Sequence, residues 1–291
     1  MQTRALGPGA PTVSVVGFGG MPLSLPGRPD EAEAIRVIHA ALDAGMTLVD
    51  TADVYCLDDT DIGHNERLVA KALRSWGGRR DGIVVATKGG MVRPGGRWER
   101  DARPEQLRRA CERSLRALGT DCIALYQLHA PDSNVPLAES VGALADLRRE
   151  GKIRWVGLSN VTVEEIRAAS AIVPVTTVQN RLSPFFREAL ETGVVARCAR
   201  EGIGFLAYSP VGGGRLNLKL PAMHALRPIA EAHSASAHAV VLAWVLAQGP
   251  TVIVIPGART VAHALDSVRS ASLVLTPDEL AAIDAAEFSR E

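Results

Sequence analysis

Short apolar runs that alternate with amphipathic segments constrain the fold of this chain more than any other feature. Several runs are continuously apolar, as expected of strands buried on both faces of a parallel sheet. Between them, apolar residues recur at helical spacing, as at Ile35, Ile38 and Leu42. Eight runs are predicted to be strands: Thr12–Phe18, Thr47–Asp50, Ile83–Lys88, Cys122–His129, Ile153–Leu158, Val175–Gln179, Ile203–Tyr208 and Thr251–Ile255. Eight such units with right-handed crossovers favour a closed (β/α)8 barrel, the TIM barrel, over an open sheet.

Local start signals support the predicted helices, and no linker divides the chain. Thr162-x-x-Glu165 has the pattern of a capping box, and Thr276-Pro277-x-Glu279 adds a proline at the first helical position. A length of 291 residues suits one barrel. We therefore expect residues 1–291 to form a single α/β domain.

Bulk composition argues against several classes of partner. Lysine plus arginine equals aspartate plus glutamate at 32 each, so net charge suggests neither a nucleic-acid nor a membrane partner. No signal peptide and no membrane-spanning stretch are visible. The four scattered cysteines predict reduced thiols in a cytoplasmic protein. No metal site is expected.

Four polar residues follow or close three of the predicted strands: Asp50, Tyr55, Lys88 and His129. The ends of parallel barrel strands meet at one mouth, where such barrels build active sites. A lysine ammonium near a phenol favours the phenolate and lowers the phenol pKa, and Asp50 is the obvious partner for Lys88. With His129 as a hydrogen-bonding group, the set suits protonation of a carbonyl oxygen that receives hydride.

Each of these residues also has a structural interpretation. Asp50 suits a turn cap, Tyr55 a rim residue, Lys88 a solvated surface lysine and His129 a satisfied core histidine. Their joint placement at successive strand ends favours the catalytic interpretation.

The hydride requires a cofactor, yet the Rossmann fingerprint is absent. Gly17-Phe18-Gly19-Gly20 follows a strand, but Pro22 stands where the third glycine belongs and no helical pattern follows directly. A nicotinamide cofactor would have to bind across the barrel mouth instead.

The chain resembles the aldo-keto reductase superfamily over nearly its whole length. The resemblance rests on motifs in the family's order: Asp50-Thr51-Ala52-Asp53-Val54-Tyr55, Asn65-Glu66-Arg67-Leu68-Val69, Ala86-Thr87-Lys88, Leu125-Tyr126-Gln127-Leu128-His129, Gly157-Leu158-Ser159-Asn160, Val178-Gln179-Asn180, Ala207-Tyr208-Ser209-Pro210 and Ile255-Pro256-Gly257-Ala258. It implies a TIM barrel that binds NADPH, less often NADH, in extended form. It also implies that Tyr55 is the general acid, that Lys88 and Asp50 lower its pKa, and that His129 orients the carbonyl.

The same resemblance implies the cofactor contacts. Ser159, Asn160 and Gln179 would hold the nicotinamide carboxamide, and Tyr208 would stack on the ring. The remaining contacts implied are Gly20, Met21 and Asp50 near the nicotinamide end, Ser209, Pro210 and Val211 along the pyrophosphate, and Gly257, Arg259, His263 and Ser267 at the adenosine end.

Two departures from the family pattern matter. After Tyr55 comes Cys56 and then an acidic loop, Leu57–Asp61, which would disfavour anionic substrates unless it is simply a solvated charge run. Cys56 is either redox-sensitive or, as we favour, passive. At the adenosine end His263, Asp266 and Ser267 replace the usual side chains, so Arg259 decides for NADPH over NADH through a forked contact with the 2′-phosphate.

The function that we predict is NADPH-dependent reduction of a small aldehyde or ketone, or the reverse reaction. Trp98, Phe185 and Phe186 are candidates for the substrate wall. Two alternatives stay open: a Schiff-base lyase or aldolase that uses Lys88, and a non-catalytic cofactor-binding subunit. The sequence leaves the substrate, the stereochemistry and the oligomeric state open.

Overall fold

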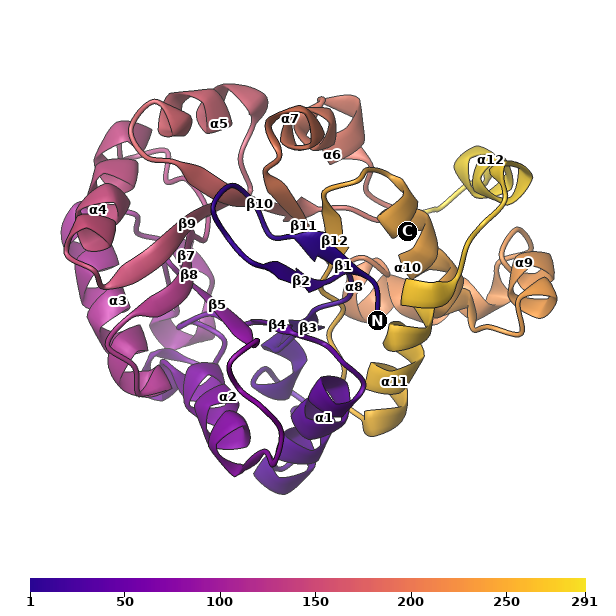
Figure 1. The fold of residues 1–291 in the computed structure, drawn as a ribbon, viewed down its shortest axis with the longest axis horizontal. Coiled ribbons are helices and arrows are strands. Elements are labelled where there is room, and N and C mark those ends of the chain that lie inside the picture. The colour runs from indigo at the N-terminus through magenta and orange to yellow at the C-terminus, as the bar shows by residue number, and fades with distance from the viewer.

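The computed structural model describes residues 1–291 as a barrel of eight parallel strands inside a ring of helices (Figure 1). In spatial order from β3 to β12, each strand pairs with the next one along the barrel. Parallel bridges from Val16 to Val254 and from Gly19 to Gly257 join the last strand to the first. The strands are β3 (Phe18–Gly19), β4 (Leu48–Asp50), β5 (Val84–Gly89), β8 (Ile123–Leu128), β9 (Ile153–Ser159), β10 (Val175–Arg181), β11 (Gly204–Tyr208) and β12 (Val252–Val254). The predicted (β/α)8 architecture is confirmed.

Helices follow the strands and cover the outside of the sheet. They are α1 (Glu31–Asp43), α2 (His64–Ser75), α3 (Pro104–Leu118), α4 (Leu137–Arg149), α5 (Val163–Ser170), α6 (Glu188–Glu191), α7 (Val194–Glu201), α8 (Gly213–Leu216), α9 (Arg227–Ala232), α10 (Ala237–Ala247), α11 (Val261–Arg269) and α12 (Pro277–Ala285). Both predicted capping boxes are present, since Thr162 and Thr276 each exchange hydrogen bonds with the glutamate three residues on. None of the helices is both long and apolar enough to cross a bilayer.

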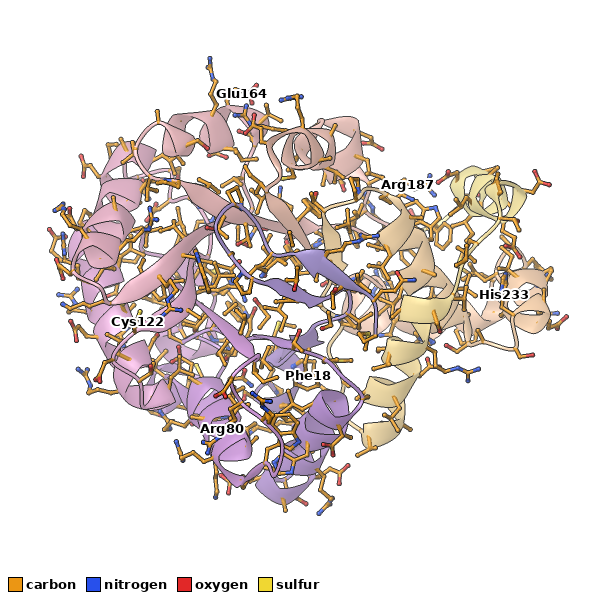
Figure 2. All side chains as sticks on the ribbon, viewed as in Figure 1. Phe18, Arg80, Cys122, Glu164, Arg187 and His233 are labelled. Carbon is orange, nitrogen blue, oxygen red and sulfur yellow. The ribbon has the colours of Figure 1, made fainter.

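Apolar side chains form two separate cores. The larger fills the space between sheet and helices and includes Phe18, which lies inside the ring of helices, whereas Arg80 and Glu164 lie at its edge (Figure 2). The smaller core has nine buried residues and includes Leu48, Leu125 and Leu206, one from each of three barrel strands. The alternation of strand side chains between these cores explains why the strands read as continuously apolar.

An N-terminal hairpin corrects the prediction of Thr12–Phe18 as one barrel strand. Residues Thr12–Ser14 form β2, which pairs antiparallel with β1 (Thr3–Ala5), and only Phe18–Gly19 enters the barrel as β3. Leu6 and Val13 join the smaller core, and Figure 1 shows the hairpin of β1 and β2 lying across the barrel. The hairpin therefore closes one end of the barrel, because the residues that begin the strands lie beside it: Ser14 N donates to Thr47 Oγ1 at 2.8 Å.

A second hairpin lies in the loop between β5 and α3. Its strands are β6 (Met91–Val92) and β7 (Glu99–Arg100), and Trp98 lies next to the second of them. Because this loop follows the carboxyl end of β5, the hairpin lies at the end of the barrel opposite the N-terminal one.

Candidate active site

Lys88 is the centre of a buried polar group at the carboxyl ends of the strands. Its Nζ donates to Asp50 Oδ2 at 2.6 Å, to the Thr51 carbonyl oxygen at 2.9 Å and to Tyr55 Oη at 3.0 Å. The lysine side chain has no exposed surface, and Asp50 has 2%. The structure thus brings together three of the four residues singled out at strand ends.

Strand register explains this meeting. Asp50 closes β4 opposite Ala86 of β5, and Lys88 comes two residues later, so it faces the same side of the sheet one step nearer the mouth. The chain turns after β4, and the Tyr55 amide donates to Ala52 O at 3.2 Å within this turn. The turn places the phenol of Tyr55 next to the Lys88 ammonium.

Two glutamine amides hold the other oxygen of Asp50. Gln179 Nε2 donates to Oδ1 at 2.7 Å and Gln127 Nε2 donates at 3.2 Å. The sequence did not predict Gln127 as a site residue. Its signal was a polar side chain in the middle of an apolar strand, because a buried amide needs partners. The carboxylate therefore has donors on both oxygens.

His129 lies directly after β8 and packs edge-on against the phenol. Its ring centroid is 5.8 Å from that of Tyr55, and its amide donates to Gly89 O at 2.9 Å. Burial, together with the nearby Lys88 ammonium, lowers the pKa of His129 well below its ordinary value. The imidazole is therefore neutral at pH 7, and its buried Nδ1 has no hydrogen-bond partner.

The pKa of Tyr55 differs in direction from the sequence-based expectation. Burial raises the pKa of this phenol, and the Lys88 ammonium opposes the rise without overcoming it. For Lys88, burial acts to lower the pKa, but Asp50 and Tyr55 outweigh burial and leave the pKa raised. At neutral pH the site therefore holds a protonated phenol next to a charged ammonium.

Trp98 covers this group from the hairpin between β5 and α3. Its ring lies edge-on to Tyr55 at 6.4 Å and to His129 at 6.3 Å between centroids. Tyr55 and His129 are only 7% and 8% exposed, whereas Trp98 itself is 43% exposed. The indole thus separates the phenol and the imidazole from solvent.

A second polar group lies at the ends of β9, β10 and β11. Asn160 Nδ2 donates to Ser159 Oγ at 3.0 Å and to His129 O at 2.9 Å, while Tyr208 Oη donates to Asn160 Oδ1 at 2.7 Å. Asn160 has a positive φ of 59°, a conformation that asparagine tolerates better than most residues. The Asn160 amide donates to Gln179 O at 3.0 Å, and Gln179 Nε2 donates to Asp50. These bonds connect this group to the one around Lys88.

The loop after β11 contains Ser209, Pro210 and Val211 and has unusual backbone geometry. Ser209 has φ 48°, and Gly212 and Gly213 have φ 89° and 83°. A side chain at Gly212 would place its Cβ 2.7 Å from the Phe185 ring. Successive backbone N–H groups in a turn of this kind can form a concavity that suits an anion.

Arg259 reaches across to the loop after β3. Its Nε donates to Pro22 O at 3.3 Å and its Nη2 to Pro26 O at 3.0 Å. Gly257 also packs against Pro22, since a Cβ there would lie 2.5 Å from the proline ring. The forked contact with a 2′-phosphate that the sequence predicted would use the same guanidinium. Its Nε and Nη2 bind backbone carbonyls, and its Nη1 has no protein partner.

The other residues expected at the cofactor lie in two places. Gly20 and Met21 follow β3, and the Gly20 amide donates to Asp50 O at 2.8 Å, next to the buried polar group. His263 and Ser267 lie on α11, where the His263 amide donates to the capping Thr260 and Ser267 Oγ donates to His263 O. His263 is exposed and Ser267 is half-buried, and both are far along the chain from the residues around Lys88.

Comparison with known proteins agrees with this geometry. The model of the aldo/keto reductase family matches residues 15–287. The chain belongs to this family of oxidoreductases. A curated relative, aldo-keto reductase str7 of Strobilurus tenacellus, is 34% identical over 97% of this chain and 91% of its own length.

Solved aldo/keto reductase structures have the same fold. The glycerol dehydrogenase AKR11B4 from Gluconobacter oxydans superposes with a TM-score of 0.84 at 31% identity, over 97% of this chain and 94% of its own. An aldo-keto reductase from Klebsiella pneumoniae, solved in complex with NADPH, has a TM-score of 0.82 at 28% identity, over 98% and 95% of the two chains.

This aldo/keto reductase departs from the family pattern after Tyr55, and the structure accounts for the departure. Two carboxylates of the acidic loop have partners in the protein itself. Asp58 accepts a hydrogen bond from Thr60, and Asp61 forms an ion pair with Arg28 at 2.7 Å. Cys56 is fully buried, and burial raises the pKa of its thiol to about 11. A protonated, inaccessible thiol supports the passive interpretation of Cys56.

Behind the Tyr55 loop lies a buried carboxyl pair for which the sequence predicted no role. Asp53 and Glu66 are both fully buried, and each has one oxygen without a partner. Thr87 donates to Glu66, and Arg113 lies 3.5 Å from Asp53. Burial and then the nearby Glu66 raise the pKa of Asp53 to about 8. At neutral pH the pair therefore holds at least one proton.

Proposed function

We propose that this aldo/keto reductase catalyses NADPH-dependent reduction of a small aldehyde or ketone, with Tyr55 as the general acid. The observation that carries the proposal is the 3.0 Å hydrogen bond from a fully buried, charged Lys88 to Tyr55 Oη. An ammonium held against a phenol stabilises the phenolate that remains after proton donation.

The residues fit a nicotinamide cofactor. Ser159, Asn160 and Gln179 offer hydroxyl and amide groups that complement a carboxamide, and the partly exposed ring of Tyr208 is accessible for stacking. The left-handed backbone at Ser209, with Gly212 and Gly213 after it, suits a pyrophosphate. The NADPH complex of the similar Klebsiella pneumoniae enzyme supports this choice of cofactor.

When bound, NADPH supplies the hydride to the carbonyl carbon. Tyr55 gives its proton to the carbonyl oxygen, and its raised pKa keeps that proton in place until charge develops on the oxygen. His129, whose imidazole is neutral, donates a hydrogen bond to the same oxygen from a ring N–H. Asp50 holds the Lys88 ammonium in position, and Trp98 excludes water from the reacting atoms.

The two alternative functions make distinguishable predictions. A Schiff-base lyase needs Lys88 as a neutral amine, and the raised pKa of Lys88 argues against it. A non-catalytic subunit would bind NADPH without reducing any member of a carbonyl panel. The presence of all four residues in one hydrogen-bonded and stacked group favours the enzyme.

Substitution of Tyr55 by phenylalanine tests the proposal. We expect turnover to fall by about 10²- to 10⁴-fold, because the proton donor is lost, and NADPH affinity measured by fluorescence quenching to stay within about threefold. Wild-type turnover in this variant would refute the mechanism.

Substitution of Arg259 by alanine tests the cofactor preference. If Arg259 gives up a backbone carbonyl to bind the 2′-phosphate, NADPH affinity falls by about tenfold or more while NADH affinity changes little. Equal loss for both cofactors would remove the phosphate role and indicate that Arg259 only supports the Pro22–Pro26 loop.

A further inference from the structure

Arg93 is a buried cation for which the chain supplies no carboxylate. Lys88 and Arg93 are the two buried lysine or arginine side chains of the molecule, at 0% and 4% exposure. Lys88 has Asp50 at 2.6 Å, whereas Arg93 has no acidic group within ion-pair distance, 4.0 Å. Its Nε and Nη1 are buried without any hydrogen-bond partner. Burial of an unpaired charge costs free energy, so an arginine kept in this state points to a partner that comes from outside.

Contacts of Arg93 place it beside the loop after Tyr55 and against Trp98. Nη2 donates to the carbonyl oxygen of Leu57, two residues after Tyr55, at 2.8 Å. The guanidinium carbon lies 4.1 Å from the centroid of the Trp98 ring. The same ring packs against Tyr55 and His129. One indole therefore contacts both the unpaired cation and the catalytic groups proposed above.

None of the carboxylates of the acidic loop forms an ion pair or a hydrogen bond with Arg93. Asp58 accepts from Thr60, Asp61 pairs with Arg28, and Asp59 accepts from the Gly95 amide at 3.3 Å. The contacts of the acidic loop therefore leave the guanidinium N–H groups of Arg93 without a carboxylate acceptor.

The segment that covers Arg93 is a short hairpin with few backbone pairings of its own. Trp98 is 43% exposed, and its hairpin has strands of only two residues each. Gly95 and Gly96, at its tip, have positive φ values of 54° and 81°. Rotation of the indole away from Tyr55 would open the catalytic groups and the guanidinium together.

We propose that Arg93 binds the carboxylate of the carbonyl substrate, so that the preferred substrates are aldehydes or ketones that carry an acidic group. The carboxylate accepts from the unpartnered N–H groups while the carbonyl oxygen faces Tyr55 and His129. An arginine holds a carboxylate through charge-assisted hydrogen bonds, and the cation that is unpaired in the free protein gains its partner on binding. This inference rests on the proposed function and names its substrate class.

A matched pair of substrates tests it: 4-formylbenzoate and its neutral methyl ester. With wild-type enzyme we expect kcat/KM to be at least about tenfold higher for the acid, the value of one charge-assisted hydrogen bond. Arg93→Met should abolish that preference, mainly by raising KM for the acid more than KM for the ester. Arg93→Lys should restore part of it. Arg97→Met, which removes an exposed arginine of the same hairpin that pairs with Glu99, is the control and should keep the wild-type preference.

Three outcomes would overturn the inference. The first is a wild-type enzyme that does not prefer the acid, and the second is an Arg93→Met variant that loses both substrates equally, which would mean that Arg93 only supports Trp98. If wild-type enzyme reduces neither substrate, the proposed function fails instead, and calorimetric binding of 4-formylbenzoate decides this inference separately. The third outcome that would overturn the inference is equal affinity of wild type and Arg93→Met for 4-formylbenzoate in that titration.

Discussion

Replacement of Lys88 by methionine should destabilise the fold as well as abolish activity. The substitution keeps most of the unbranched side chain but removes the ammonium from Asp50 Oδ2, Thr51 O and Tyr55 Oη. At 2.6 Å, the charge attraction between Lys88 and Asp50 is about 6 kcal/mol with an effective dielectric constant of about 20. Desolvation offsets part of it, so we expect the free energy of unfolding to fall by about 3–5 kcal/mol, the usual cost of removing one partner of a buried pair.

A double variant separates the unpaired charge from the lost packing. Asp50→Asn in the Lys88→Met background removes the stranded carboxylate and leaves an amide that can still meet Gln127 and Gln179. We therefore expect the double variant to regain about 1–3 kcal/mol relative to Lys88→Met. Urea unfolding followed by tryptophan fluorescence gives both values.

Two results would refute this reasoning. If Lys88→Met loses less than about 1 kcal/mol, the ammonium is not buried and paired as described. If Asp50→Asn adds its cost to that of Lys88→Met instead of offsetting it, the two side chains are not energetically coupled. Both outcomes are independent of any cofactor or substrate.

Two further predictions concern stability away from the catalytic groups. Because the folded-state pKa of Asp53 is raised to about 8 from 3.8, stability contributed by its protonated form is lost as pH rises from about 4 to 8. Asp53→Asn should reduce this slope, which is at most about 1.4 kcal/mol per pH unit for one group, and an unchanged slope in urea unfolding across this range would contradict it. Gly204→Ala would place a Cβ 2.0 Å from the Leu6 carbonyl oxygen and should cost about 2 kcal/mol or more by displacing the N-terminal hairpin. Gly142→Ala, in the middle of α4 with no atom near its Cβ, is the control and should stabilise by about 0.5–1 kcal/mol; equal effects of the two substitutions on the melting temperature would rule out the clash.

The sequence alone was sufficient for features that depend on local pattern. Short, continuously apolar runs identified the strands, because both faces of a strand in a covered parallel sheet contact apolar side chains. The capping boxes at Thr162 and Thr276 were predicted because their hydrogen bonds join residues three apart. The meeting of Asp50 with Lys88 was predictable because parallel register brings successive strand ends to one mouth.

Tertiary structure decided whatever depends on burial and on contacts distant in sequence. The run Thr12–Phe18 divides because its first residues pair with Thr3–Ala5 and close the barrel, which no local pattern signals. Gln127 joins Asp50 across 77 residues. The pKa of Tyr55 rises because desolvation outweighs the ammonium beside it, and desolvation depends on the packing of the whole mouth. The unpaired charge of Arg93 is likewise visible only when every neighbouring carboxylate has been assigned a partner. The sequence by itself thus determined which groups reach the mouth, and the packed barrel decided their protonation, their partners and the cation left without one.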